Sequence, residues 1–132
     1  MIIMKNYEKP VVMVNEGLAE GVYAASGCWS TTRSDVENKG NGWFYAYITV
    51  SHADVAHGNY AEMTVEFSEP VSVRFANYSQ LTTGTSNVHT FSRNEPINAG
   101  QCNWQITIEG DAESGDASNL TVKRVTVVDS GN

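Results

Sequence analysis

Basic residues are scarce in this 132-residue sequence. Eight Lys and Arg stand against 15 Asp and Glu, which gives a formal net charge of −7. The basic residues are scattered, and the nearest approach to a cluster is the pair Lys123-Arg124. Binding to nucleic acid or to anionic lipid normally uses a concentrated basic patch. We therefore expect no nucleic-acid partner.

Long apolar runs are also missing. No stretch approaches the roughly 20 apolar residues of a membrane-spanning helix, nor the apolar run of about 7–15 residues in a secretory signal. We expect no membrane span and no standard secretory signal. The abundance of Ser, Thr, Asn and Gly, together with six Tyr, is typical of an extracellular all-β domain. We expect an extracellular or cell-surface protein, and a cytoplasmic location stays open.

Cysteine occurs only twice, at Cys28 and Cys102. In an exported protein these two residues are candidates for one disulfide. A loop of that length would stabilise the fold by roughly 4 kcal/mol in the chain-entropy model. In a reducing cytosol they would remain thiols. The sequence leaves both alternatives open.

Residues 43–51, in which side chains suited to a core alternate strictly with aromatic and polar ones, are the central strand of the predicted fold. The set suited to a core is Phe44, Ala46, Ile48 and Val50, and the opposite set is Trp43, Tyr45, Tyr47 and Thr49. A period of two is the signature of a β-strand with two different faces. The row of three aromatic residues is either covered by a second layer or exposed as a platform for a ligand.

Shorter patterns of the same kind, separated by turn residues, predict further strands. They lie at 28–32, 60–67, 71–75, 85–91, 101–109 and 120–128. No segment has a helical period. Seven to eight short strands with regular turn signals predict an all-β, two-sheet antiparallel sandwich, jelly-roll or Ig-like, without substantial helix.

Local features of these strands give more detailed expectations. Residues 37–42 predict a turn, and residues 68–70 a break, because Pro70 lacks the N–H of a ladder. The pattern in 71–75 places Phe75 on the face of Val71 and Val73, with Arg74 opposite. The apolar parity of the last strand switches at Lys123-Arg124, which predicts a β-bulge.

Residues 1–27 differ from the rest of the chain. The motif Lys5–Pro10, followed by the small-residue stretch Asn15–Gly27, resembles the N-terminal leader of small precursor proteins from gut-type Clostridia. The resemblance implies a bacterial protein with an N-terminal targeting segment. It leaves open whether the chain is cleaved after Gly27. A lipoprotein signal is disfavoured because Glu16 and Glu20 interrupt the apolar segment. We divide the chain into a leader-like arm at 1–27 and a β-sandwich domain at 28–132. The alternative is that residues 1–27 form a strand and arm of the same fold.

Metal-ligating patterns are weak. The histidines, His52, His57 and His89, match no zinc spacing, and we expect them to be solvated loop residues. An acidic loop contains Asp111, Glu113 and Asp116 but lacks the EF-hand spacing. We expect no cofactor and keep a structural calcium ion at this loop as the alternative.

Catalytic motifs do not stand out either. Glu62 and Glu66 share a predicted strand face, which is ordinary for an exposed strand. Neither cysteine lies in a nucleophile motif, and no phosphate-binding glycine loop or Ser/His/Asp signature is found. We expect that the protein is not an enzyme.

The aromatic row Trp43, Tyr45 and Tyr47 is the best candidate for a binding site, because ligand sites combine aromatic rings with a few polar groups. Segments 42–50, 60–67, 74–78 and 96–110 follow the order of features in the cellulose-binding type of carbohydrate-binding module. Over roughly residues 28–110 the chain resembles that family, although a tryptophan expected in the second of these segments is replaced by Tyr60 as its nearest equivalent. The resemblance implies a polysaccharide or glycan ligand and adds Tyr78 to the candidate binding residues.

Two functions are consistent with these patterns. The first is a non-catalytic secreted glycan-binding module that uses an exposed aromatic face. The second is a secreted structural or interaction protein, which self-associates or binds a protein partner. It would use the edge-like strand 85–91, the apolar run 11–14 and the aromatic face.

Overall fold

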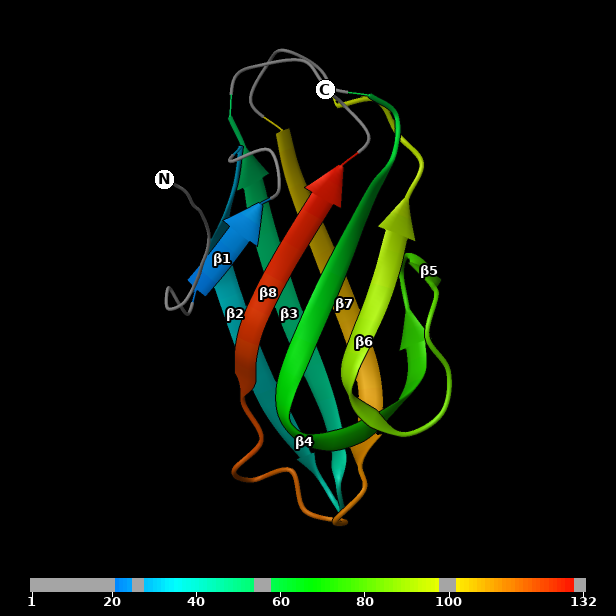
Figure 1. Ribbon diagram of the computed structural model, residues 1–132. Coiled ribbons are helices and arrows are strands. Elements are labelled where there is room, and N and C mark those ends of the chain that lie inside the picture. The colour runs from blue at the N-terminus through cyan, green and yellow to red at the C-terminus, as the bar shows by residue number, and fades with distance from the viewer. Residues whose placement is uncertain (1–20, 25–27, 54–57, 98–101, 130–132) are drawn as a thin grey trace, which may run out of the picture.

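The structure is a computed structural model that describes residues 21–24, 28–53, 58–97 and 102–129, with the backbone alone for 21–24 and 102. These residues form eight strands and no helix, and so none that could cross a membrane (Figure 1). The strands are β1 (Gly21–Ala24), β2 (Trp29–Gly40), β3 (Trp43–His52), β4 (Ala61–Ala76), β5 (Ser79–Gln80), β6 (Ser86–Arg93), β7 (Cys102–Ala112) and β8 (Val122–Asp129). The all-β prediction is confirmed.

The strands form two layers joined by β4. Hydrogen bonds give the order β1-β8-β4-β7-β3-β2, with β6 on β4 and β5 on β6. The first half of β4 pairs with β8 and β6, whereas its second half pairs with β7. The sheet therefore folds over on itself, as Figure 1 shows, with β8, β4 and β6 in front of β2, β3 and β7. All pairs are antiparallel except β1 with β8.

The break predicted at residues 68–70 is instead a bend in a continuous strand. The Ser68 N–H donates to the carbonyl of Thr121 at 2.8 Å, and the carbonyl of Pro70 accepts from the Glu113 N–H at 3.0 Å. Pro70 has no N–H to donate, and the partner of β4 changes beside it. The prediction of two separate strands is therefore wrong, because one strand belongs to both layers.

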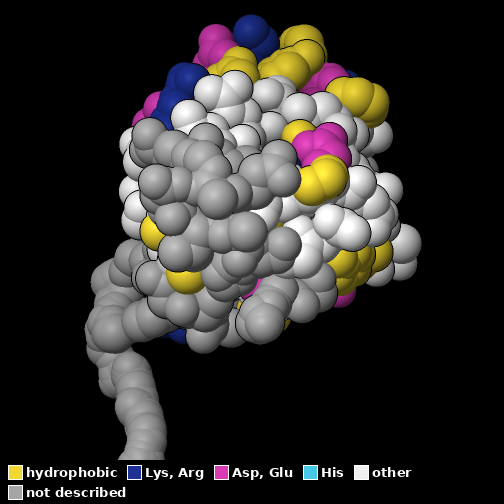
Figure 2. Space-filling view, turned by 90° about the horizontal axis from the view of Figure 1, so that it is seen from above, with side chains coloured by type: hydrophobic (Ala, Val, Ile, Leu, Met, Phe, Trp, Pro, Cys, Tyr) yellow, Lys and Arg dark blue, Asp and Glu magenta, His cyan; other side chains and the backbone are white. Residues whose placement is uncertain are grey.

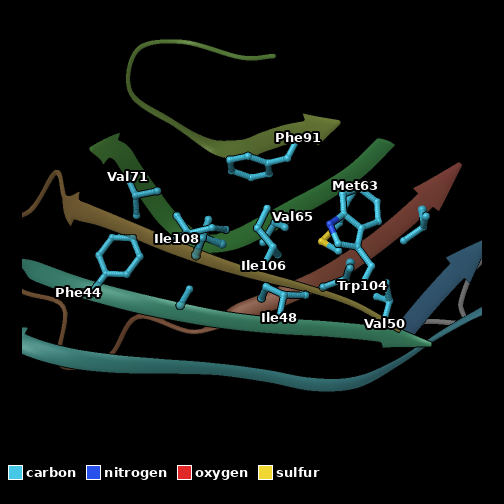
Figure 3. Close-up of a cluster of buried hydrophobic side chains, with 14 of the residues drawn as sticks. Phe44, Ile48, Val50, Met63, Val65, Val71, Phe91, Trp104, Ile106 and Ile108 are labelled. Atoms are coloured by element: carbon cyan, nitrogen blue, oxygen red, sulfur yellow. The ribbon is translucent and has the colours of Figure 1, made fainter. Parts of the chain in front are cut away.

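The core lies between the layers and includes the predicted inward set of β3, Phe44, Ala46, Ile48 and Val50. Its largest fully buried side chains include Trp104, Phe44, Phe91, Ile48 and Met63, which Figure 3 labels, and Phe67. The rings of Phe44 and Phe67 meet edge to face across the layers, with centroids 5.6 Å apart. This geometry is favourable for aromatic pairs beyond the area that they bury.

The strand β2 is longer than predicted and reaches the turn itself. It ends at Gly40, and the turn is formed by residues 40–42, which all have positive φ: 103° at Gly40, 57° at Asn41 and 84° at Gly42. These are conformations that Gly and Asn adopt at low cost. Beyond Thr31, β2 is largely exposed and charged, with Val36 packed against the core. A strand with so little apolar surface gives no alternation to detect.

Two of the β-bulges in the sheet determine which residues of β8 and of the second half of β4 face outward. Glu66 lies opposite Arg124 and Phe67 opposite Val122, so Lys123 is the extra residue and the predicted bulge in β8 is confirmed. A second bulge was not predicted. Val73 lies opposite Gly110 and Phe75 opposite Glu109, which makes Arg74 the extra residue of β4. Phe75 therefore faces outward and is 60% exposed, so its predicted place beside Val73 is wrong.

Most of the proposed leader lies outside the described residues. Within it, only β1 is described, and its backbone pairs with β8 in parallel, Val22 opposite Val125. The two cysteines lie at one end of the sheet, on either side of β3. The Cys28 carbonyl accepts from the Ala53 N–H at 2.8 Å, and Cys102 lies opposite His52. The Cys102 side chain is outside the described residues, so the disulfide stays a prediction.

The close packing of β7 on its neighbours gives a stability test. A Cβ on Gly110 would collide with the backbone oxygen of Ser72 and lie 3.0 Å from Cζ of Phe44. We expect Gly110→Ala to lower the free energy of unfolding by about 1–3 kcal/mol, the usual cost of overpacking. Urea denaturation measures this change. The exposed Gln105→Ala on the same strand is the control and should change it by less than about 0.5 kcal/mol. Equal changes in both variants would contradict this account of Gly110.

Candidate ligand-binding face

The three predicted aromatic residues of β3 lie together on the outer side of the sheet. Trp43, Tyr45 and Tyr47 are each half-buried, and we call them the aromatic row. The Trp43 and Tyr45 ring centroids are 5.9 Å apart, and those of Tyr45 and Tyr47 are 6.2 Å apart, with planes only 19° from parallel. These distances match the roughly 6.7 Å repeat of residues on one strand face. The rings therefore form a continuous surface.

Charged strands flank the aromatic row on both sides. On β2, Glu37 lies opposite Tyr45, and on β7, Glu109 lies opposite the same residue. Directly opposite residues on paired strands share a face. The other outward residues of β7 are polar: Asn103, Gln105, Thr107 and Asp111. The outer face of β2, β3 and β7 is thus aromatic along its middle strand and polar or charged along its sides.

Hydrogen bonds fix two of the rings in place. The indole N–H of Trp43 donates to Oε2 of Glu109 at 2.9 Å, and the Tyr47 hydroxyl donates to Oε1 of Glu37 at 2.8 Å. The Tyr47 hydrogen bond, assisted by the charge of Lys39, holds the pKa of Glu37 below its ordinary value of 4.5. The same hydrogen bond raises the pKa of Tyr47 above 10.0.

Cationic side chains lie over the ring faces. The guanidinium carbon of Arg33 is 4.7 Å from the Tyr47 centroid, and Nζ of Lys39 is 5.5 Å from that of Tyr45. Arg74 reaches the Trp43 ring at 5.6 Å. All three fall within the roughly 6 Å range of cation–π attraction. Cationic side chains therefore lie over part of the aromatic row, so its rings are not the simple exposed platform that was one of the two expectations from the sequence.

Arg74 ties the aromatic row to the acidic end of β7. Its Nε and Nη2 donate to the two Asp111 carboxylate oxygens at 2.7 and 2.8 Å, and its Nη1 is 3.7 Å from Oε2 of Glu109. Such fork-shaped pairs have the strongest geometry for a guanidinium and a carboxylate. The hydrogen bond to Asp111 raises the pKa of Arg74.

Phe75 is a member of this face that sequence reasoning missed. It lies opposite Glu109, which in turn lies opposite Tyr45, so the three residues form one line across β4, β7 and β3. The pattern Val71, Val73, Phe75 is unbroken in the sequence, and it contains no signal of the bulge at Arg74. Figure 2 shows hydrophobic side chains mixed with acidic and basic ones at one rim of the molecule, which is the character of this face.

Tyr78, the fourth predicted binding residue, lies apart from the aromatic row. Its ring packs on the inward-facing Trp104, with centroids 5.5 Å apart and planes at 73°. It lines a separate hollow of about 440 Å³ bordered by residues 76–79 and 92–95. The structure brings together three of the four predicted residues and places Tyr78 in a different environment.

Two of the histidines are buried, which corrects the expectation that they are solvated. His52 is 1% exposed, with its ring centroid 4.6 Å from that of Trp29. His89 is 0% exposed, and its Nε2 donates to the carbonyls of Val71 and Ser86, each at 2.9 Å. His89 therefore ties β6 to the bend of β4. His57 lies outside the described residues.

Two carboxylates of the acidic loop have partners within the protein. Asp111 pairs with Arg74, and Oδ1 of Asp116 accepts from the Ser118 N–H at 2.9 Å, which lowers the pKa of Asp116. Within the part of the chain that the structure describes, no group of three or more His, Cys, Asp or Glu side chains is arranged to hold a metal ion. A calcium ion stays an untested alternative.

Comparisons with known proteins give no family. No family model and no curated protein matches the sequence. Among solved structures, the chain is similar to the solution structure of the chitin-binding domain of a hyperthermophilic chitinase from Pyrococcus furiosus, with a TM-score of 0.49 and 13% sequence identity. The similarity covers 80% of this chain and 90% of that chain.

The Tyr47–Glu37 hydrogen bond can be tested by titration. In the wild type, we expect the Glu37 carboxylate to titrate below 4.5, because the hydrogen bond favours its charged form. Tyr47→Phe should shift that midpoint upward, toward 4.5. A lowered folded-state pKa stabilises the fold above pH 4.5, and this contribution is lost as the pH falls through the folded-state value.

Carboxyl NMR as a function of pH measures the midpoint. Tyr60→Phe is the matched control, since it removes a hydroxyl that donates to Glu62 at 2.6 Å instead. A Glu37 midpoint that moves equally in both variants, or in neither, would show that the Tyr47 hydroxyl does not set it.

Proposed function

We propose that the chain is a non-catalytic, exported glycan-binding module that contacts its ligand through the outer face of β3, β7 and the second half of β4. The observation that carries this proposal is the exposed Phe75, aligned across β7 with Tyr45 of the aromatic row. A large apolar side chain at 60% exposure, beside three further rings and many polar groups, has the composition of a ligand site.

The spacing of the strands suits an extended ligand. Neighbouring strands lie about 4.8 Å apart, so the backbones of Phe75 and Tyr45 are separated by roughly 10 Å. Between them run the outward residues of β7, including Gln105, Thr107 and Glu109. A sugar ring stacked by its C–H face on Phe75 would have hydrogen-bonding groups of β7 beside its hydroxyls.

The charges of the face support this role. A hydroxyl group both donates and accepts hydrogen bonds, while guanidinium only donates and carboxylate only accepts. The pairs Arg74–Asp111 and Lys39–Glu37 supply both functions side by side. Because these pairs also hold the rings in place, a ligand would meet a face that loses little side-chain freedom on binding.

The shape of the face favours binding over catalysis. Glycoside hydrolysis uses two carboxyl groups across a cleft, whereas this face is the open side of a sheet. The sequence also has no nucleophile motif.

The alternative, a protein that assembles through edge strands, has less support. In the described sheet order β2 is a terminal strand, and its exposed residues include Arg33, Asp35 and Lys39. Charges along an edge discourage strand addition. The predicted edge 85–91 falls in β6, which pairs with β4 on one side, while on its other side the Leu81 N–H donates to the carbonyl of Thr90 at 2.8 Å.

Retention on insoluble polysaccharides tests the proposal. The full chain is mixed with cellulose, xylan, chitin or mucin, beside Phe75→Ala and the double variant Trp43→Ala, Tyr45→Ala. We expect the wild type to be retained on at least one of them. Phe75→Ala should weaken retention about tenfold, the equivalent of ~1.4 kcal/mol, with an unchanged melting temperature because Phe75 is largely exposed.

Leu81→Ala is the matched control, because Leu81 is 47% exposed but lies outside the face. It should bind like the wild type. Failure of the wild type to bind any of the four materials, or wild-type retention by Phe75→Ala, would refute the glycan-binding face. Association that rises with protein concentration in sedimentation would then favour the assembly alternative.

A further inference from the structure

We propose a second ligand site, for a single neutral sugar or similar polyol, in the hollow lined by residues 76–79 and 92–95. We call it the lateral hollow. Its volume of about 440 Å³ falls in the range of roughly 300–1,000 Å³ that small-molecule sites occupy. The site does not depend on the outer face, because Tyr78 packs on the inward-facing Trp104 whereas the aromatic row points away from the core.

The wall of the hollow is a buried guanidinium held in a fixed position. Arg93 is only 5% exposed. Its guanidinium carbon lies 5.9 Å from the Trp104 ring centroid, and its Nη2 donates to the Pro96 carbonyl at 3.4 Å. The Trp104 ring is fixed in turn by the edge-to-face contact with Tyr78. A buried arginine between a ring and a backbone carbonyl forms a rigid part of the wall.

The charge of the hollow is balanced, which selects the class of ligand. Oε1 of Glu95 lies 3.3 Å from Nη2 of Arg93, so one positive and one negative charge share the same lining. A carboxylate or phosphate ligand would meet Glu95 as well as Arg93, on a chain whose net charge is already −7. A neutral ligand does not suffer this repulsion.

The hydrogen-bonding groups suit adjacent hydroxyls. The carboxylate of Glu95, whose side chain is 54% exposed, supplies acceptors, and the amide of Asn94 supplies both donors and acceptors. Ser79 and Ser92 also line the hollow. Vicinal hydroxyls of a sugar need donors and acceptors next to one another, and the Tyr78 ring offers an apolar surface for a C–H face.

Asn77 has a structural role in this site. Its Oδ1 accepts from the Thr107 N–H at 2.9 Å, and its Nδ2 donates to the Gln105 carbonyl at 3.4 Å. These bonds continue the pairing of β7 where β4 ends. Asn77 therefore holds the border of the hollow, and Asn94, which is exposed at the rim, is the residue to vary.

An amide NMR titration of the full chain tests the proposal. Glucose, N-acetylglucosamine and xylose are added separately, and sodium acetate and glucuronate serve as anionic probes. We expect at least one neutral sugar to shift the backbone amides of residues 77–79 and 92–95 in a saturable manner. Asn94→Ala should weaken that binding about fivefold, the effect of one lost hydrogen bond worth ~1 kcal/mol. The exposed Asn119→Ala is the control and should leave it unchanged.

A charge variant tests the assigned ligand class. Glu95→Gln removes the negative charge. We expect glucuronate and acetate to shift the wild-type amides of the hollow only weakly and to bind the variant more tightly. No saturable shift with any neutral sugar, or equal affinity of Asn94→Ala and the wild type, would overturn the proposal. Wild-type binding of acetate or glucuronate tighter than that of the neutral sugars would overturn the neutral class.

The proposals for the two sites can be overturned independently of each other. Sugar-induced shifts confined to residues 43–47 and 75 would overturn the lateral hollow and leave the outer face intact. In the polysaccharide assay, Asn94→Ala should be retained like the wild type, since it lies outside the outer face. Loss of that retention would contradict the independence of the two sites.

Discussion

The change of partner within β4 is the constraint on which the rest of the structure depends. One strand of 16 residues supplies a neighbour for β8 and β6 in one layer and for β7 in the other. The bend at 68–70 lets both halves turn their apolar residues toward the same core. His89, buried beside this bend and bonded to the Val71 carbonyl, fixes β6 against it. Without the change of partner, β7 would have no strand on its outer edge.

The same constraint creates the outer face. Because β7 lies between β3 and the second half of β4, it brings Phe75 into line with the aromatic row. Charges of both signs surround the aromatic row. Carboxylates accept hydrogen bonds from Trp43 and Tyr47, and cations lie over the ring faces. The face is thereby ordered by internal contacts, and it offers one large ring, that of Phe75, largely to solvent.

Sequence reasoning succeeded where burial is one-sided and failed where it depends on distant residues. The inward set of β3 was predicted because this strand buries one face completely. The bulge at Lys123 was predicted since it interrupts the apolar parity, whereas the bulge at Arg74 leaves the pattern of β4 unbroken. The burial of His52 and His89 depends on partners far along the chain. Tyr78 was added by the resemblance in the order of features, which does not say which side chains of different segments meet.

The parallel pairing of β1 with β8 has a mechanical consequence. The first and last described strands run side by side in the same direction, with four residue pairs from Gly21–Arg124 to Ala24–Val127. A pulling force applied to the start of β1 and the end of β8 would act along the strands, so that these backbone hydrogen bonds carry the load in shear and together. An antiparallel pair at the same place would be peeled apart one bond at a time. The arrangement therefore favours resistance to tension between the two ends of the domain.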